Sequence, residues 1–404
     1  MKYIEENPDG IKSAEIVIGI PSYNEASSIF FPTEQADKGL VKYYSNRAAV
    51  IINCDNDSDD GTGEAFLGVK TQTPKIYVST ESGVRGKGNN LKNLFLKAVE
   101  LDAKAIVVVD ADLKSITPLW VRNLCEPVLD NYDFVAPLYI RHKYDVTVTN
   151  NIAYPLTRSL YGRRVRQPMG GDVAFSGALA KQFVETEFWT EKVGAFGIDI
   201  WMTTIALRSR SSVIQSFMGK PKLHKIRDLD SHLDMMFEDV VSTMFDLMIE
   251  YESFWREVKW SRPTAVFGFG LGDVEMPPPV EMDTHRLWEN FIGGIRKDWD
   301  LYADVISREN LNKLEEVVDL PVGGFEFPAG LWAKIIYDFA ISYRNHSFDR
   351  SKLVRALIPI HYGKTLSFVT ETQAMNNQQV EEFIEDQCAQ FEKAKSYLVE
   401  KWFA

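Results

Sequence analysis

The chain has 404 residues, of which 45% are hydrophobic and 25% are charged, so it has the composition of a folded protein and not of a disordered one. Its length is roughly two to three times that of a typical single domain, which favours a second structural unit. The net charge of -12 argues against nucleic acid or an anionic membrane surface as a partner.

The three cysteines, Cys54, Cys125 and Cys388, form no C-x-x-C pair, so neither a disulfide framework nor a zinc site is indicated. Residues 1–10 are polar and lack the apolar core of a secretory signal. Apolar runs such as residues 105–109 are far shorter than the ~20 residues of a membrane span. We therefore expect a cytoplasmic protein with reduced thiols and no membrane partner.

The first half of the chain alternates compact apolar runs with segments of helical periodicity. Because buried parallel strands appear as short, continuous apolar runs, this alternation predicts an open α/β sheet. The expected strands are residues 15–20, 48–53, 75–79, 105–109 and 133–137, and the expected crossover helices are residues 33–45 and 87–101.

The pattern of apolar residues changes from about residue 228, where long stretches carry apolar residues at helical spacing without strand patterns between them. These stretches are residues 228–258, 282–306, 328–343 and 379–402. We expect two domains, an α/β domain over residues 1–227 and an α-helical domain over residues 228–404.

Two acidic turns follow predicted strands. Asp110-Ala111-Asp112 places two carboxylates where ligands of open α/β sheets bind, and carboxylates are suitable ligands for Mg²⁺ or Mn²⁺. Alone, such a pair also arises by chance in any acidic turn. Residues 55–62 either cap the next helix or hydrogen-bond a nucleotide.

A glycine-rich segment, residues 85–90, opens the predicted helix, which we expect to begin near Leu91. Its glycines, its lysine and arginine, and the helix N-terminus suit a phosphate group. The segment has neither the spacing of a P-loop nor that of a dinucleotide-binding loop.

The order of these motifs resembles that of GT-A glycosyltransferases: residues 21–25 after the first strand, residues 55–62 after the second, residues 86–88 before a helix, and the paired acids at 110–112. The resemblance implies a Rossmann-like mixed sheet with helices on both faces, a UDP- or GDP-sugar donor, and Mg²⁺ or Mn²⁺ bound through Asp112. It also implies a set of donor-binding residues: Pro21, Tyr23, Glu25, Asp55, Asp57, Gly86, Lys87, Asp110 and Ala111.

Downstream, residues 167–172, 196–199 and 222–225 are similar in order to elements of the mannosylglycerate synthase and glucosyl-3-phosphoglycerate synthase families. This resemblance implies that His224 completes the metal site and that the loop ending at Asp172 binds the acceptor, although Met169 and Asp172 replace the Leu and Glu of the family loop. The expected acceptor-binding residues are Arg163, Arg166, Gly170, Gly171 and Asp172.

Each of these residues also has a plainer interpretation. His224 could be an ordinary surface residue, the arginines a solvated face, and Asp199 an acid at a helix N-terminus. In the functional interpretation Asp199 orients a substrate hydroxyl or acts as a general base, and the expected catalytic residues are Asp199, Asp112 and Lys87.

These observations lead to one expected function with two alternatives. We expect a metal-dependent, retaining glycosyltransferase, a homodimer, that moves glucose or mannose to a small anionic acceptor, glycerate or 3-phosphoglycerate. The alternatives are an inverting GT-A enzyme acting on a polyprenyl phosphate or polysaccharide, and a nucleotide-sugar-binding protein without turnover.

Overall fold

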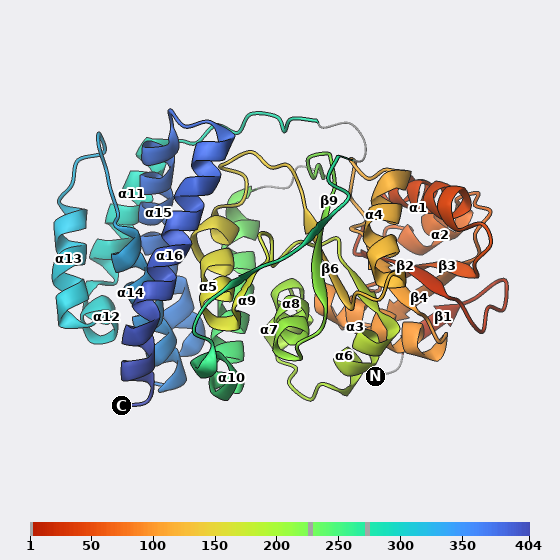
Figure 1. The fold of residues 1–404 in the computed structure, drawn as a ribbon, viewed down its shortest axis with the longest axis horizontal. Coiled ribbons are helices and arrows are strands. Elements are labelled where there is room, and N and C mark those ends of the chain that lie inside the picture. The colour runs from red at the N-terminus through yellow and green to blue at the C-terminus, as the bar shows by residue number, and fades with distance from the viewer. Residues whose placement is uncertain (1–2, 225–228, 271–274) are drawn as a thin grey trace. The chain divides into compact units, whose positions relative to one another are not determined.

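The computed structural model describes residues 3–224, 229–270 and 275–404 (Figure 1). The chain forms two compact units, and each is assembled from separate stretches of sequence. The first comprises Met1–Arg141, Val165–Leu229 and Thr264–Pro277, and the second His142–Arg164, Asp230–Pro263 and Pro278–Ala404. The expected boundary between residues 227 and 228 lies outside the described residues. Residues 142–164 and 264–277 depart from the expected division into two continuous stretches.

The first unit is built on a nine-stranded sheet with the strand order β1-β4-β3-β2-β5-β8-β6-β9-β11. Its strands are β1 (Tyr3–Glu6), β2 (Ile16–Ser22), β3 (Ala49–Asp55), β4 (Lys75–Thr80), β5 (Ala105–Val108), β6 (Phe134–Leu138), β8 (Ala174–Ser176), β9 (Val213–Phe217) and β11 (Val266–Phe267). The pairs among β4, β3, β2 and β5 are parallel, whereas β8 runs antiparallel to both β5 and β6. The five predicted strands are confirmed, and the sheet is mixed, as expected.

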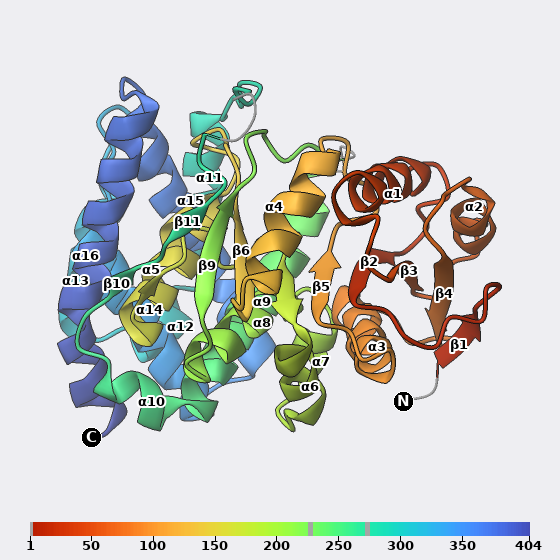
Figure 2. The same cartoon turned by 45° about the vertical axis from the view of Figure 1, so that its right-hand side comes forward.

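Helices cover both faces of this sheet, which confirms the predicted α/β architecture (Figure 2). One group of contacting helices comprises α1 (Phe30–Tyr44), α2 (Thr62–Gly68) and α4 (Pro118–Leu129). The other comprises α3 (Lys87–Glu100), α6 (Gly177–Glu185), α7 (Glu191–Gly194) and α8 (Ile198–Arg208).

Strand β2 shows why a two-sided sheet forms. All seven of its residues are buried, so both of its faces must be covered. Gly19 lets helix α3 approach closely, because a Cβ at this position would lie 2.2 Å from a methyl group of Leu94. Helix α3 begins at Lys87, and its close packing on β2 therefore fixes where that lysine stands.

The second unit is mainly helical, as predicted for most of its residues. Its helices are η1 (Thr149–Ala153, a π-helix), α5 (Tyr154–Tyr161), α9 (Leu229–Glu250), α10 (Glu252–Glu257), α11 (Thr284–Lys297), α12 (Trp299–Val305), α13 (Arg308–Val318), α14 (Ala329–Arg344), α15 (Arg350–Thr372) and α16 (Asn377–Trp402). The short strands β7 (Arg163–Arg164) and β10 (Arg262–Pro263) pair in parallel. Within the described residues, no helix has both the length and the apolar character needed to cross a bilayer.

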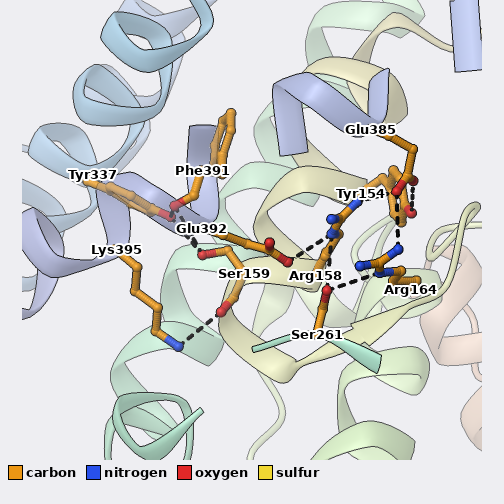
Figure 3. Close-up of polar contacts among 10 residues, drawn as sticks. All are labelled: Tyr154, Arg158, Ser159, Arg164, Ser261, Tyr337, Glu385, Phe391, Glu392 and Lys395. Atoms are coloured by element: carbon orange, nitrogen blue, oxygen red, sulfur yellow. Dashed lines mark hydrogen bonds and ion pairs between the residues drawn. The ribbon is translucent and has the colours of Figure 1, made fainter. Parts of the chain in front are cut away.

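A buried arginine joins α5 to the C-terminal helix α16 (Figure 3). Arg158 is 4% exposed, and its guanidinium group lies 2.6 Å from a carboxylate oxygen of Glu385 and 2.8 Å from one of Glu392. Tyr154 donates a hydrogen bond of 2.6 Å to Glu385. Because charged hydrogen bonds are stronger than neutral ones, this group holds the two helices together.

Lys395 forms a second link on α16 (Figure 3). Its Nζ donates to the carbonyl oxygens of Ser159, at 2.9 Å, and of Val258, at 2.7 Å. Burial lowers the pKa of the Lys395 ammonium group to about 7. The helical unit therefore contains a buried amine whose charge changes near neutral pH.

Candidate functional site

The carboxyl ends of β2, β3 and β5 meet at one edge of the sheet, where ligands of open α/β sheets bind. The turns after β2 and β3 are hydrogen-bonded to each other. The backbone N–H of Asn24 donates to Ser58 Oγ at 2.8 Å, and that of Glu25 donates to Thr62 Oγ1 at 2.9 Å. The structure thus joins the first two predicted motifs, which lie about 30 residues apart in sequence.

The two aspartates expected to meet the base differ in their surroundings. Asp55 is 1% exposed, and its carboxylate accepts hydrogen bonds from Ser22 Oγ at 2.6 Å and Tyr77 Oη at 3.1 Å, besides two from Ser58. These bonds shape the turn. Asp57 is only half-buried and has a left-handed backbone with φ of 55°. Of the two, Asp57 has more surface to offer a nucleotide.

Of the residues expected in the first turn, Tyr23 presents the most surface. Pro21 is buried inside β2, and Glu25 is 4% exposed, with its carboxylate accepting a hydrogen bond from Ser28. Tyr23 is 47% exposed, and the guanidinium carbon of Arg85 lies 4.4 Å from the centre of its ring. Arg85 also donates to the carbonyl oxygen of Asn56 at 2.6 Å. Tyr23 and Arg85 therefore form a flat surface beside the turn that follows β3.

Next along this edge lies a cluster of alternating charges, which we call the charge cluster: Lys87, Asp110, Asp172, Asp199 and Lys222. Lys87 Nζ lies 3.0 Å from Asp110 Oδ1 and 3.1 Å from Asp199 Oδ2. Lys222 Nζ lies 2.5 Å from Asp110 Oδ2 and 2.9 Å from Asp172 Oδ2. Asp110 is thus held between two ammonium groups.

Burial and ion pairing act in opposite directions on these groups. Burial disfavours the charge on Asp110, but the ammonium groups of Lys222 and Lys87 outweigh it and hold the pKa of Asp110 well below its usual range. For Asp199 burial dominates and raises the pKa, although Lys87 opposes it. The carboxylates of Asp110 and Asp199 in turn raise the pKa of Lys87 against the effect of burial. Both Asp110 and Lys87 are charged at neutral pH.

Glycines place Lys87 in this cluster. Gly86 has a φ of 112°, in the region that favours glycine, and an added Cβ would lie 2.3 Å from the carbonyl oxygen of Gly194. An added Cβ on Gly88 would lie 1.9 Å from the carbonyl oxygen of Val193. The glycines expected to admit a phosphate therefore admit the backbone of residues 193–195, which leads into α8 and Asp199.

The predicted acceptor loop, residues 167–172, packs closely around the charge cluster, to which its last residue, Asp172, belongs. A Cβ on Gly170 would lie 2.3 Å from the ring of Pro137, and one on Gly171 would lie 2.6 Å from Asp110 Oδ2. Asp172 is fully buried, and its carboxylate accepts from the backbone N–H of Asp110 at 3.0 Å and from Tyr139 Oη. Acceptor binding by Asp172 stays a prediction, but its burial indicates a structural role.

Asp112 and His224 were expected to hold a metal. Asp112 is half-buried, His224 is exposed, and Ala111 is 3% exposed. Partial desolvation and the ammonium group of Lys222 lower the pKa of His224, while the Asp112 carboxylate raises it, so the two side chains are within electrostatic reach. The net lowering leaves a neutral imidazole that can coordinate a metal near pH 7. Among the described residues, no three His, Cys, Asp or Glu side chains gather as metal ligands.

The two predicted arginines do not share a unit. Arg166 belongs to the sheet unit, where its backbone N–H donates to Gln215 Oε1 at 2.7 Å. Arg163 lies in β7 of the helical unit. Sequence reasoning assigned no role to Lys222, Tyr139 or Arg141. The only signal was the position of Lys222 two residues before His224.

The fold and the site together define a class: an α/β protein with a mixed sheet whose strand ends gather lysines and carboxylates, a set suited to an anionic ligand and a cation. No protein-family model matches the chain, and no curated protein sequence matches it.

Solved structures with a similar arrangement include glucosyl-3-phosphoglycerate synthase from Mycobacterium tuberculosis in complex with Mn²⁺, UDP and glucosyl-3-phosphoglycerate. It is 23% identical, with a TM-score of 0.46, and the match covers 58% of this chain and 80% of that chain. The same enzyme with Mn²⁺, UDP and phosphoglyceric acid is 22% identical, with a TM-score of 0.45, over 58% and 78% of the two chains. A structure described only as a mycobacterial protein is 21% identical, with a TM-score of 0.44, over 58% and 74%.

Proposed function

We propose that this chain is a metal-dependent GT-A glycosyltransferase that moves a glucosyl or mannosyl group from a nucleotide diphosphate sugar to a small anionic acceptor. One observation carries the proposal: Lys87, Asp110 and Asp199 meet at the carboxyl ends of the parallel strands, beside Asp112 and His224. The four ordered motifs in the sequence resemble those of this class and supply the reaction type.

Lys87 is the group proposed to meet the donor diphosphate. It is charged, it stands at the N-terminus of α3, and a helix N-terminus adds positive potential where a phosphate binds. Tyr23 and Asp57 are proposed to meet the base and its ribose from the two joined turns. This arrangement orders the donor along the sheet edge, with the base at β2 and β3 and the diphosphate near α3.

Asp112 and His224 fit a divalent cation. A carboxylate oxygen and a neutral imidazole nitrogen are both suitable ligands for Mn²⁺, and Mg²⁺ usually completes its coordination with substrate phosphates and water. Two protein ligands are therefore sufficient. When bound, the cation would stabilise the negative charge that develops on the departing diphosphate.

The acceptor is proposed to be glycerate or 3-phosphoglycerate, as the sequence resemblance of residues 167–172 implies. Its carboxylate or phosphate would meet guanidinium groups, which bind such anions with two parallel hydrogen bonds. Arg141 is close enough to the site to lower the pKa of His224, and we add it to the predicted Arg166 of the same unit. Gly170 and Gly171 stay predicted acceptor residues, although the backbone N–H of Gly170 already donates to the carbonyl oxygen of Gln167 at 3.2 Å.

We propose retention of the anomeric configuration. Asp199 is tied to Lys87 through Oδ2, whereas its buried Oδ1 has no hydrogen-bond partner among the described residues. This free oxygen suits a hydrogen bond from a sugar or acceptor hydroxyl. Lys87 occupies Oδ2 of Asp199 at 3.1 Å, so we propose that Asp199 orients a hydroxyl and that the acceptor proton leaves with the departing diphosphate, on the same face of the sugar.

The test is to incubate the protein with UDP- and GDP-linked glucose and mannose, Mn²⁺ or Mg²⁺, and each acceptor, and to follow nucleotide release. Asp112→Asn should lower the rate by about two orders of magnitude or more. Asp130→Asn, at an exposed position of the same unit, is the matched control. Proton NMR of the product reads the anomeric configuration, and an inverted product would favour the alternative enzyme. Equal rates for Asp112→Asn and the wild type would refute the metal assignment.

A further inference from the structure

We propose that Asp172 is a positioning residue that holds together the two chain segments carrying Asp112 and His224, and that it does not contact the acceptor. This inference rests on the proposed function, because it concerns the proposed metal site. It also replaces the role that the sequence resemblance assigned to Asp172.

The contacts of Asp172 come from three different parts of the sheet unit. Its carboxylate accepts from the backbone N–H of Asp110 at 3.0 Å, lies 2.9 Å from Lys222 Nζ, and accepts from Tyr139 Oη just beyond β6. The side chain of Asp172 has no exposed surface. One carboxylate therefore joins the end of β5, the segment after β9, and the end of β6.

The spacing of these contacts relates them to the proposed metal ligands. Asp110 stands two residues before Asp112, and Lys222 stands two residues before His224. Asp172 thus contacts each ligand-bearing segment at the same distance along the chain from its ligand. A shift of either contact would move the corresponding ligand with it.

Other contacts between these two segments show that they lie side by side. Lys222 Nζ reaches Asp110 Oδ2 at 2.5 Å, the N–H of Lys114 donates to the carbonyl of Leu223 at 2.7 Å, and the N–H of Leu223 donates to Ser115 Oγ at 2.9 Å. These last two bonds hold Lys114 and Ser115, which follow Asp112, against Leu223, which directly precedes His224. Together with the contacts of Asp172 to Asp110 and Lys222, they hold the segment of Asp112 on both sides of that residue and the segment of His224 on its N-terminal side.

A contact with the acceptor would require an accessible carboxylate. Asp172 has none, and its negative charge is already matched by Lys222. Its neighbour Gly171 is also closed in, since an added Cβ would lie 2.8 Å from Lys87 Nζ and 3.0 Å from Lys222 Nζ. These neighbours shield the Asp172 carboxylate from an acceptor anion.

The test compares the wild type, Asp172→Asn and the control Asp130→Asn. Binding of Mn²⁺ is measured by electron paramagnetic resonance of the free ion with saturating UDP, and the acceptor KM is measured separately at saturating Mn²⁺. Asp172→Asn keeps the shape but removes the charge that holds Lys222. It should raise the Mn²⁺ Kd about tenfold, the lower end of what loss of a direct partner of a metal ligand costs, because Asp172 contacts the ligand-bearing segments and not the ligands, and it should leave the acceptor KM nearly unchanged.

An unchanged Mn²⁺ Kd with a raised acceptor KM would overturn the positioning role while leaving the proposed function intact. If the wild type neither binds Mn²⁺ with UDP nor releases nucleotide, the proposed function fails and this inference fails with it. If circular dichroism shows that Asp172→Asn does not fold, Tyr139→Phe decides. That variant removes one hydrogen bond to the same carboxylate and should raise the Mn²⁺ Kd by a smaller factor.

Discussion

The buried Lys395 gives the helical unit a stability that depends on pH. Burial lowers its pKa to about 7, whereas a lysine in an unfolded chain has a pKa of about 10.4. Between these values the unfolded chain binds the proton and the folded chain does not, so the free energy of unfolding rises with pH. Below about pH 7 both states are protonated and the dependence stops. Between pH 7 and 9 the gain is about 2 kcal/mol.

The substitution Lys395→Met removes this titration together with the hydrogen bonds to the carbonyls of Ser159 and Val258. Urea unfolding followed by far-UV circular dichroism at a series of pH values measures the effect. The wild type should gain about 2 kcal/mol over the variant between pH 7 and 9. Lys364, whose pKa burial lowers to about 8, contributes equally to both proteins and cancels. Lys393→Met, at an exposed position of the same helix, is the control. Parallel pH profiles for the wild type and Lys395→Met would refute the reasoning.

Two further substitutions test the packing of the site and of the helical unit. Gly171→Ala would place a Cβ 2.6 Å from Asp110 Oδ2. We expect it to lower the free energy of unfolding by about 1–3 kcal/mol and to weaken UDP binding measured by calorimetry. The control Gly68→Ala, whose added Cβ would have nothing within 4 Å, should be neutral. Wild-type UDP affinity in Gly171→Ala would contradict the crowding. Arg158→Met leaves Glu385 and Glu392 without their cation. Their side chains are 40% and 29% exposed and can regain water, so we expect the free energy of unfolding to fall by only about 2 kcal/mol. Differential scanning calorimetry should show a melting temperature lower by about 4–8 °C, and an unchanged value would mean that the ion pairs contribute nothing.

Much of the sheet could be predicted from the sequence because its central strands are buried on both faces. The apolar run predicted at residues 15–20 became β2, Ile16–Ser22, in the middle of the parallel pairs. Strand β8, Ala174–Ser176, was not predicted. It has only three residues, and its place depends on antiparallel pairing with β5 and β6, which no local pattern records.

The residues of the site likewise fall into those that a local sequence pattern indicates and those that depend on contacts between distant parts of the chain. Lys87 and Asp110 could be proposed from the sequence because one starts a helix and the other follows a strand, and both positions can be located from periodicity. Lys222 was not assigned a role. Its importance comes from its ion pairs with Asp110, which lies 112 positions earlier in the chain, and with Asp172. Asp172 was assigned to the acceptor through the family resemblance of residues 167–172, and its full burial, which led us to propose a positioning role, cannot be seen in the sequence.

The division of the chain has a consequence for the order in which the protein is completed during synthesis. Helix α5, Tyr154–Tyr161, leaves the ribosome well before α16, Asn377–Trp402, against which it packs. Until then the apolar side chains of Ile152, Leu156 and Leu160, all buried in the finished protein, lack part of their cover. Nascent chains with such exposed surface are prone to aggregate and are the usual clients of chaperones. Premature termination before α16 should therefore lower the yield of folded protein, because α5 would keep part of its apolar surface uncovered.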